Sequence, residues 1–203
     1  AAGGVGLIMT EGVEVSHPSS SGYPDCPKLD SDEAKRMWEK VVSEVHGNGS
    51  AIFCQLWHVG GIRKLGMPPL PEIPGFTPSG YVKPGKKVAY EMTLEDIQEL
   101  VQVYALDAKI CEELGFDGVE IHGAHGYLID QFFWDAINTR TDAYGGSLEN
   151  RARFATEILQ ASQQLTSSEF QVGIRVSQWK QQDYEAKITE DKDELNAFFN
   201  ILK

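Results

Sequence analysis

The chain has 203 residues, 41% hydrophobic and 24% charged, which is enough for one domain with a real hydrophobic core. Its formal net charge of −12 argues against a nucleic-acid surface or an anionic membrane surface as a partner, and no apolar run approaches the roughly 20 residues of a membrane span. The three widely spaced cysteines, Cys26, Cys54 and Cys111, indicate a reducing compartment, so the expected location is cytoplasmic.

The first quarter of the chain predicts a strand, a helix and a second strand. Residues 5–11, VGLIMTE, form a short apolar run typical of a buried strand. A capping box of Asp30 and Glu33 predicts the start of a helix, and Gly47 predicts its end. Residues 50–57, SAIFCQLW, predict a second buried strand.

A long connection and the clearest helix of the sequence follow. Residues 58–92 are rich in Pro and Gly, and their length makes them a candidate functional loop. Thr93 and Asp96 then predict a helix start, and apolar residues recur at every third or fourth position until Gly115.

The last part of the chain repeats the alternation. Residues 117–122 predict a third strand, which a second long loop follows. Ser147 is expected to cap a helix over 148–165, residues 170–177 predict a fourth strand, and 190–202 predict the start of a fourth helix.

Four repeats of a strand and a helix predict a parallel sheet with right-handed crossovers. An open doubly wound sheet and an eight-stranded barrel both fit, and both place function where the long connections lie, after the strands. The glycine-rich turn of a dinucleotide-binding sheet is missing, because GGVG at 3–6 precedes a strand. The α/β barrel is therefore favoured. The chain lacks an initial Met and stops within an amphipathic helix, so we expect a piece of a longer protein.

Polar residues end the inward faces of the predicted strands. Because side chains alternate along a strand, the aliphatic faces should pack on helices while Gln55, His122 and Arg175 end the opposite faces. The matching end of the first strand is Thr10 to Gly12. An amide can donate and accept along the edge of a flat heterocycle, and a guanidinium can stabilise negative charge on a reduced ring. His125 lies just past the third predicted strand, so it is expected near the same edge of the sheet as Gln55, His122 and Arg175.

Other polar residues have simpler interpretations. A buried Gln or Arg at a strand end often caps neighbouring backbone, and His58 is interpreted in the same way. His17 and His46 are expected to be ordinary surface residues, and Cys54 a small core residue facing the helices.

Several segments together closely resemble one known family. They are LIMTEGVEVS, QLWHVGG, the stretch from EMTLEDIQ to FDGVEIHG, and the motif from His122 to Phe154. They are similar to the old yellow enzyme family of FMN-dependent NAD(P)H:flavin oxidoreductases, or ene-reductases, along essentially the whole chain. The resemblance implies a TIM (β/α)8 barrel, incomplete here. Residues 1–203 would be a single segment of that barrel domain, holding its second to fifth βα units, with the first strand and last three strands missing.

The resemblance also implies a cofactor site for FMN, with NAD(P)H as the reductant. Gln55 would bond the pyrimidine edge of the flavin, Gly12 would lie against its ring, and Arg175 would sit near N1 and O2. Some relatives add an iron–sulfur cluster and a second domain downstream.

The implied reaction is reduction of the C=C bond of an α,β-unsaturated carbonyl compound, an enone or enal. His122 and His125 would bind the carbonyl oxygen, Tyr127 would give a proton to the alpha carbon, and Trp57 would line the pocket. Two fixed imidazole N–H donors would stabilise the negative charge that develops on that oxygen.

Two alternatives stay open. The first is a metal-dependent barrel hydrolase with His122, His125 and Glu120 as ligands, although HGAH lacks the helical HExxH geometry and Gln55 suits a metal poorly. The second is a non-catalytic half-barrel. Phosphate commonly binds after strands seven and eight of such barrels, so the 203 residues alone are expected to bind FMN weakly or not at all. Two open strand edges would also invite pairing with another copy into a homo-oligomer.

Overall fold

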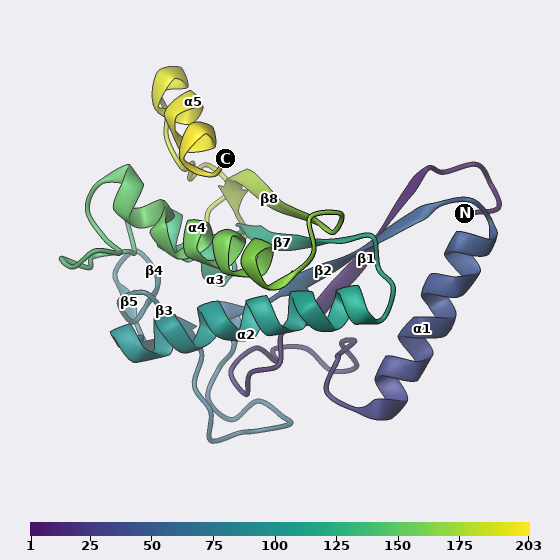
Figure 1. Cartoon of the computed structure of the whole chain (residues 1–203). Coiled ribbons are helices and arrows are strands. Elements are labelled where there is room, and N and C mark those ends of the chain that lie inside the picture. The colour runs from purple at the N-terminus through teal and green to yellow at the C-terminus, as the bar shows by residue number, and fades with distance from the viewer.

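The computed structural model describes residues 1–203 and is built on one parallel sheet (Figure 1). Its strands are β1 (Leu7–Glu14), β2 (Ala51–Trp57), β7 (Gly118–His125) and β8 (Gln171–Lys180). They lie side by side in the order β1-β2-β7-β8, which is also their order along the chain. Every neighbouring pair is parallel, which confirms the predicted α/β class with a parallel sheet.

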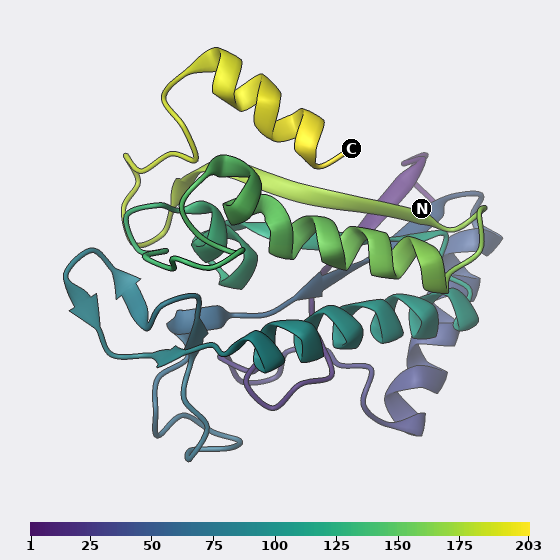
Figure 2. The ribbon, with the colours of Figure 1, turned by 60° about the vertical axis from the view of Figure 1, so that its left-hand side comes forward.

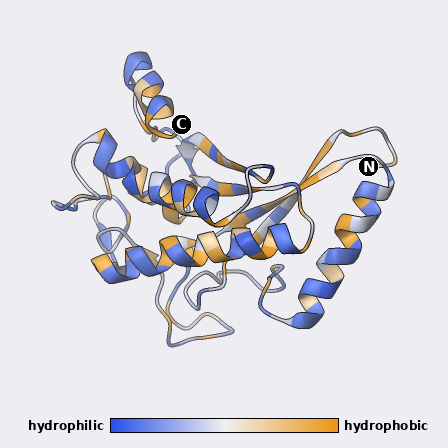
Figure 3. Ribbon diagram, in the orientation of Figure 1, coloured by the Kyte–Doolittle hydropathy of each residue, from blue (hydrophilic) through white to orange (hydrophobic).

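Helices follow the strands, and the two longest of them cover one face of the sheet. They are α1 (Asp32–Gly47), α2 (Leu94–Glu113), the short α3 (Leu128–Phe133), α4 (Leu148–Leu165) and α5 (Lys192–Ile201). Helices α2 and α4 lie against each other over the sheet in both ribbon views (Figures 1 and 2). Hydrophobic and hydrophilic residues alternate along these helices, as expected for elements with one buried side (Figure 3).

The core lies between the helices and the aliphatic face of the sheet. Ile52, Cys54 and Leu56 of β2 are buried, as are Val119 and Ile121 of β7, and all five belong to one hydrophobic cluster. The opposite face stays partly accessible and carries the polar residues. The predicted assignment of the two strand faces, including Cys54 as a core residue, is confirmed.

The connection from 58 to 92 is more ordered than a plain loop. It contains a 3-10 turn, η1 (Gly60–Ile62), and two small sheets. In one, β3 (Phe76–Thr77) pairs with β6 (Tyr90–Glu91); in the other, β4 (Tyr81–Lys83) pairs with β5 (Lys86–Lys87).

Several predicted boundaries are wrong by a few residues. Ser31, not Asp30, caps α1, since its hydroxyl accepts the Ala34 N–H. Three strands extend past their predicted ends, so that β1 reaches Glu14, β7 reaches His125 and β8 reaches Lys180, whereas β2 ends at Trp57 as predicted. The loop after β7 contains α3, which was not predicted.

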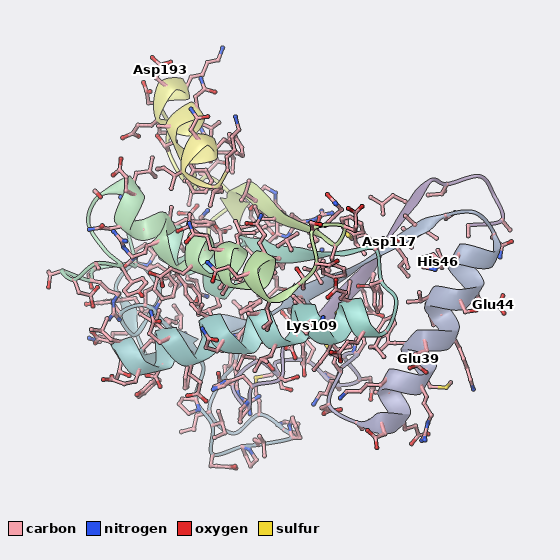
Figure 4. All side chains as sticks on the ribbon, in the orientation of Figure 1. Glu39, Glu44, His46, Lys109, Asp117 and Asp193 are labelled. Atoms are coloured by element: carbon pink, nitrogen blue, oxygen red, sulfur yellow. The ribbon has the colours of Figure 1, made fainter.

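Helix α1 is fastened to the N-terminal edge of the sheet. The Asp117 carboxylate at the start of β7 lies 2.8 Å from the His46 ring and accepts the Ile52 N–H, also at 2.8 Å (Figure 4). Burial alone would raise the pKa of Asp117, but these hydrogen bonds hold it below its ordinary value.

His17, expected at the surface, is largely covered: its side chain is 11% exposed and bonds to Ser19. No helix is long and apolar enough to cross a membrane.

Candidate functional site

An open cavity of about 290 Å³ lies at the C-terminal ends of β1, β2 and β7. Five of the residues predicted for the site line it, together with three others from the same edge: Gly12, Gln55, Trp57, His122 and Tyr127, with Glu11, Tyr23 and Cys26. His125 and Arg175 lie next to it. The His125 ring centre is 5.2 Å from that of His122, and Arg175 is paired with His122 in the register of β7 and β8.

Gln55 and Arg175 meet on a residue between them. Glu120 is opposite Gln55 in the register of β2 and β7, and its Oε2 accepts hydrogen bonds from Gln55 Nε2 and from Arg175 Nε, the latter at 2.9 Å. Sequence reasoning treated Glu120 only as an alternative metal ligand. The alternation of side chains that selected Gln55 and Arg175 places Glu120 on the same face, so this role could have been recognised.

His122 is buried without a hydrogen-bond partner. The residue is only 5% exposed, yet neither nitrogen of its ring has a hydrogen-bond partner in the protein. Burial lowers its pKa to about 3, with further lowering from His125 and Arg175. The ring is therefore neutral at neutral pH and holds one N–H and one acceptor nitrogen free for a ligand.

His125 has an unusual backbone and an aromatic neighbour. Its φ of +62° lies in the left-handed region, and its N–H donates to Ser177 Oγ at 2.8 Å. The ring stacks on Trp179 with 4.5 Å between centres. Burial lowers the pKa of His125, and the charges of Arg175 and Lys180 lower it further. Both imidazoles are thus held in the neutral form.

Tyr127 places a phenol next to the two imidazoles. Its ring meets His122 edge-on at 5.3 Å and Trp57 at 5.1 Å between centres. Its hydroxyl lies 3.4 Å from that of Tyr23. Burial and then the Tyr23 hydroxyl raise the pKa of Tyr127, so it stays a protonated acid. Nothing in the pattern around Tyr23 singled it out, since it lies in an irregular segment without periodicity.

Gly12 allows Trp57 to pack across the cavity. A Cβ built at this position would lie 3.1 Å from the Trp57 ring, closer than such contacts normally come. The pairing of β1 with β2 also shifts register between Met9 and Gly12, an irregularity of the kind that bends a strand.

The remaining histidine near the site has a structural partner. His58 is buried, and its Nδ1 accepts the Gly60 N–H at 2.9 Å, which agrees with its interpretation as a backbone cap. No group of three His, Cys, Asp or Glu side chains is arranged to hold a metal ion. Glu120, which the hydrolase alternative requires as a ligand, is instead occupied by Gln55 and Arg175.

Comparison with known proteins identifies similar sequences along the whole chain. A model of the NADH:flavin oxidoreductase / NADH oxidase family matches residues 1–202. The chain is 40% identical over 182 residues to 12-oxophytodienoate reductase 2 of Arabidopsis thaliana, covering 85% of this chain and 48% of that protein. It is 43% identical over 179 residues to flavin oxidoreductase hxnT of Emericella nidulans, with 85% and 46% covered. With putative 12-oxophytodienoate reductase 5 of Oryza sativa it shares 38% over 203 residues, 95% and 52% covered. The chain thus spans about half the length of the curated relatives it matches.

Proposed function

The chain belongs to the NADH:flavin oxidoreductase / NADH oxidase family, which is the old yellow enzyme family of flavoprotein oxidoreductases, and we propose that it carries residues that bind the flavin and the substrate of an FMN-dependent ene-reductase. The four-stranded sheet is part of the TIM barrel of that family. The proposed reaction adds two hydrogens across the C=C bond of an α,β-unsaturated carbonyl compound. The beta carbon takes a hydride that originates from NAD(P)H, the alpha carbon takes a proton, and NAD(P)+ leaves.

The residues at the inner face of the sheet fit an isoalloxazine ring. Gln55 keeps its amide oxygen free, and the terminal nitrogens of Arg175 have no partner in the protein, so both can bond a polar ring edge. Gly12 borders the same cavity. We propose that these three hold FMN, which when bound supplies the electron chemistry by accepting hydride from NAD(P)H and delivering it to the alkene.

Glu120 prepares this cofactor site. Its carboxylate fixes the Gln55 amide and the Arg175 guanidinium at once. It also balances part of the positive charge of Arg175, whose side chain is 46% exposed on this face. We expect Glu120 to orient both groups toward the ring without touching it.

The observation that carries the proposal is the pair of unpartnered nitrogens of His122. A buried polar group without a partner is costly, and a carbonyl oxygen of the substrate would satisfy its N–H. His125, neutral and adjacent, offers a second N–H to the same oxygen. Two such donors stabilise the negative charge that grows on this oxygen as the beta carbon is reduced.

Tyr127 is the proposed proton donor. It lies beside both Trp57 and His122 in the cavity, and its raised pKa keeps the proton available at neutral pH. A phenol in a fixed position can protonate the alpha carbon from one side only, which would make the addition stereospecific.

The test is Tyr127→Phe in the full-length gene product loaded with FMN. Removing the donor should slow reduction of an enone by about 10²- to 10⁴-fold, the usual contribution of general acid catalysis. Bleaching of the flavin by NAD(P)H needs no proton from this phenol and should keep its rate. Tyr184→Phe is the matched control, since Tyr184 is 72% exposed. Equal rates of enone reduction in Tyr127→Phe and the wild type would contradict the proposal, and so would a wild-type protein with bound FMN that reduces no enone.

A further inference from the structure

An ion pair without any contact with solvent lies beneath the turn that carries His125 and Tyr127. Lys180 Nζ, at the end of β8, is 2.7 Å from Asp130 Oδ1 on α3, and neither side chain has exposed surface. Burial raises the pKa of Asp130 to about 6, and the Lys180 ammonium opposes that rise by favouring the ionised carboxylate. Burying two charges is costly unless their remaining hydrogen-bonding groups are satisfied. The reaction proposed above uses neither residue.

The second oxygen of Asp130 holds the turn itself. Oδ2 accepts the Gly126 N–H at 2.7 Å. Gly126 has φ +81° and His125 has φ +62°, so two consecutive residues are left-handed, one of them not glycine. Such a backbone persists only where its surroundings hold it in place. The Asp130 carboxylate therefore bonds both the Lys180 ammonium and the N–H of the strained peptide between His125 and Gly126.

Strand β8 holds the same turn from the other side. Lys180 is paired with His125 in the register of β7 and β8. Nearby, Ser177 Oγ accepts the His125 N–H at 2.8 Å, and the Gln181 N–H donates to the His125 carbonyl at 3.2 Å. The backbone of His125 is thus bonded to β8 at both its amide and its carbonyl.

We propose that the Asp130–Lys180 pair is a positioning device that sets the spacing between the His125 imidazole and the Tyr127 phenol. The inference rests on the function proposed above. Gly126 is the residue between the two, so a shift of its peptide moves both. A carboxylate suits this position because it accepts from the ammonium at one oxygen and from the peptide N–H at the other. An Asn would turn an NH2 group toward one of these two donors.

The experiment compares Asp130→Leu, Lys180→Met and the double variant in the full-length protein loaded with FMN. Each single variant leaves one buried charge without its partner and lowers the resistance to urea, whereas the double variant removes both charges and recovers most of it but still lacks the acceptor of the Gly126 N–H. In all three, kcat for enone reduction is expected to fall about 10- to 100-fold, the scale for a misplaced reacting group. The solvent deuterium isotope effect should increase, because proton delivery from Tyr127 becomes slower. Lys187→Met is the control, since the Lys187–Glu190 pair is exposed.

Histidine NMR gives a readout that does not depend on turnover. The ring resonances of His125 should shift in the three variants, while those of His46 at the opposite edge of the sheet stay in place. If the double variant regains wild-type kcat together with stability, or if the His125 resonances do not move, the pair is only structural and the inference is overturned. Where the single variants do not fold, the double variant decides alone. A wild type that reduces no enone refutes the proposed function, and the His125 resonances still decide the positioning role.

Discussion

At the scale of single residues, the sequence is informative wherever strand alternation decides the direction of a side chain. Gln55, His122 and Arg175 were expected at one edge, and the structure does bring them together on one face of the sheet. Sequence reasoning missed what lies between and beneath them. The pairing of Lys180 with Asp130 depends on β8 being longer than predicted and on a short helix without a periodic signal.

Burial of His122 predicts a dependence of stability on pH. The pKa of the folded state, about 3, lies below the ordinary 6.5, so between these values the unfolded state binds a proton that the folded state does not. The free energy of unfolding should therefore rise with pH through this window, and the full contribution is present above 6.5. Urea unfolding, measured at several pH values between about 3 and 6.5, should show that the free energy of unfolding depends less steeply on pH in His122→Gln than in the wild type. An imidazole resonance of His122 that titrates near 6.5 would refute this.

At the scale of elements, caps and periodicity determine how well the helices can be predicted. Thr93 and Asp96 mark the expected start of α2, and they form a capping box with both reciprocal hydrogen bonds present. Asp30 and Ser31 are adjacent and both are favourable caps, so local preference could not choose between them. Helix α3 has only six residues and all of them are buried. It therefore has no exposed face, and its sequence lacks the helical alternation of polar and apolar residues from which a helix is predicted.

The capping box of α2 makes a measurable contribution to stability. Thr93→Ala removes the hydroxyl that accepts the Asp96 N–H at 3.1 Å, and we expect it to lower the free energy of unfolding by about 1 kcal/mol. Thr156→Ala within α4 is the matched control: this hydroxyl bonds to a carbonyl of its own helix, so its loss should have little effect. Equal losses in the two variants by urea denaturation would show that the cap is not the cause.

At the scale of the whole molecule, the sheet has two open edges. Strand β1 pairs only with β2, and β8 pairs only with β7, so each leaves one side without a partner strand. The architecture could be predicted because strands and helices alternate along the chain, and in the structure the strands also lie side by side in chain order. Ligand binding is harder to predict from this sheet alone, because the matched relatives are about twice as long as this chain.

We expect the 203 residues by themselves to bind FMN weakly or not at all. Barrels of this kind commonly hold phosphate in the loops after the seventh and eighth strands, so a segment with four sheet strands would rely on ring contacts alone. Absorbance titration of the purified 203-residue chain with FMN checks this, and size-exclusion chromatography shows whether the open edges pair into a homo-oligomer. A yellow, stoichiometric complex would contradict the prediction.

The two hydrogen bonds of Asp117, to the His46 ring and to the Ile52 N–H, lie where the strands begin, whereas Tyr127 and its neighbours lie where the strands finish. In barrels, catalysis is confined to the finishing side, so the starting side is free to change for robustness. An engineer could therefore tune heat tolerance at the base of this protein and selectivity at its rim as two nearly independent problems.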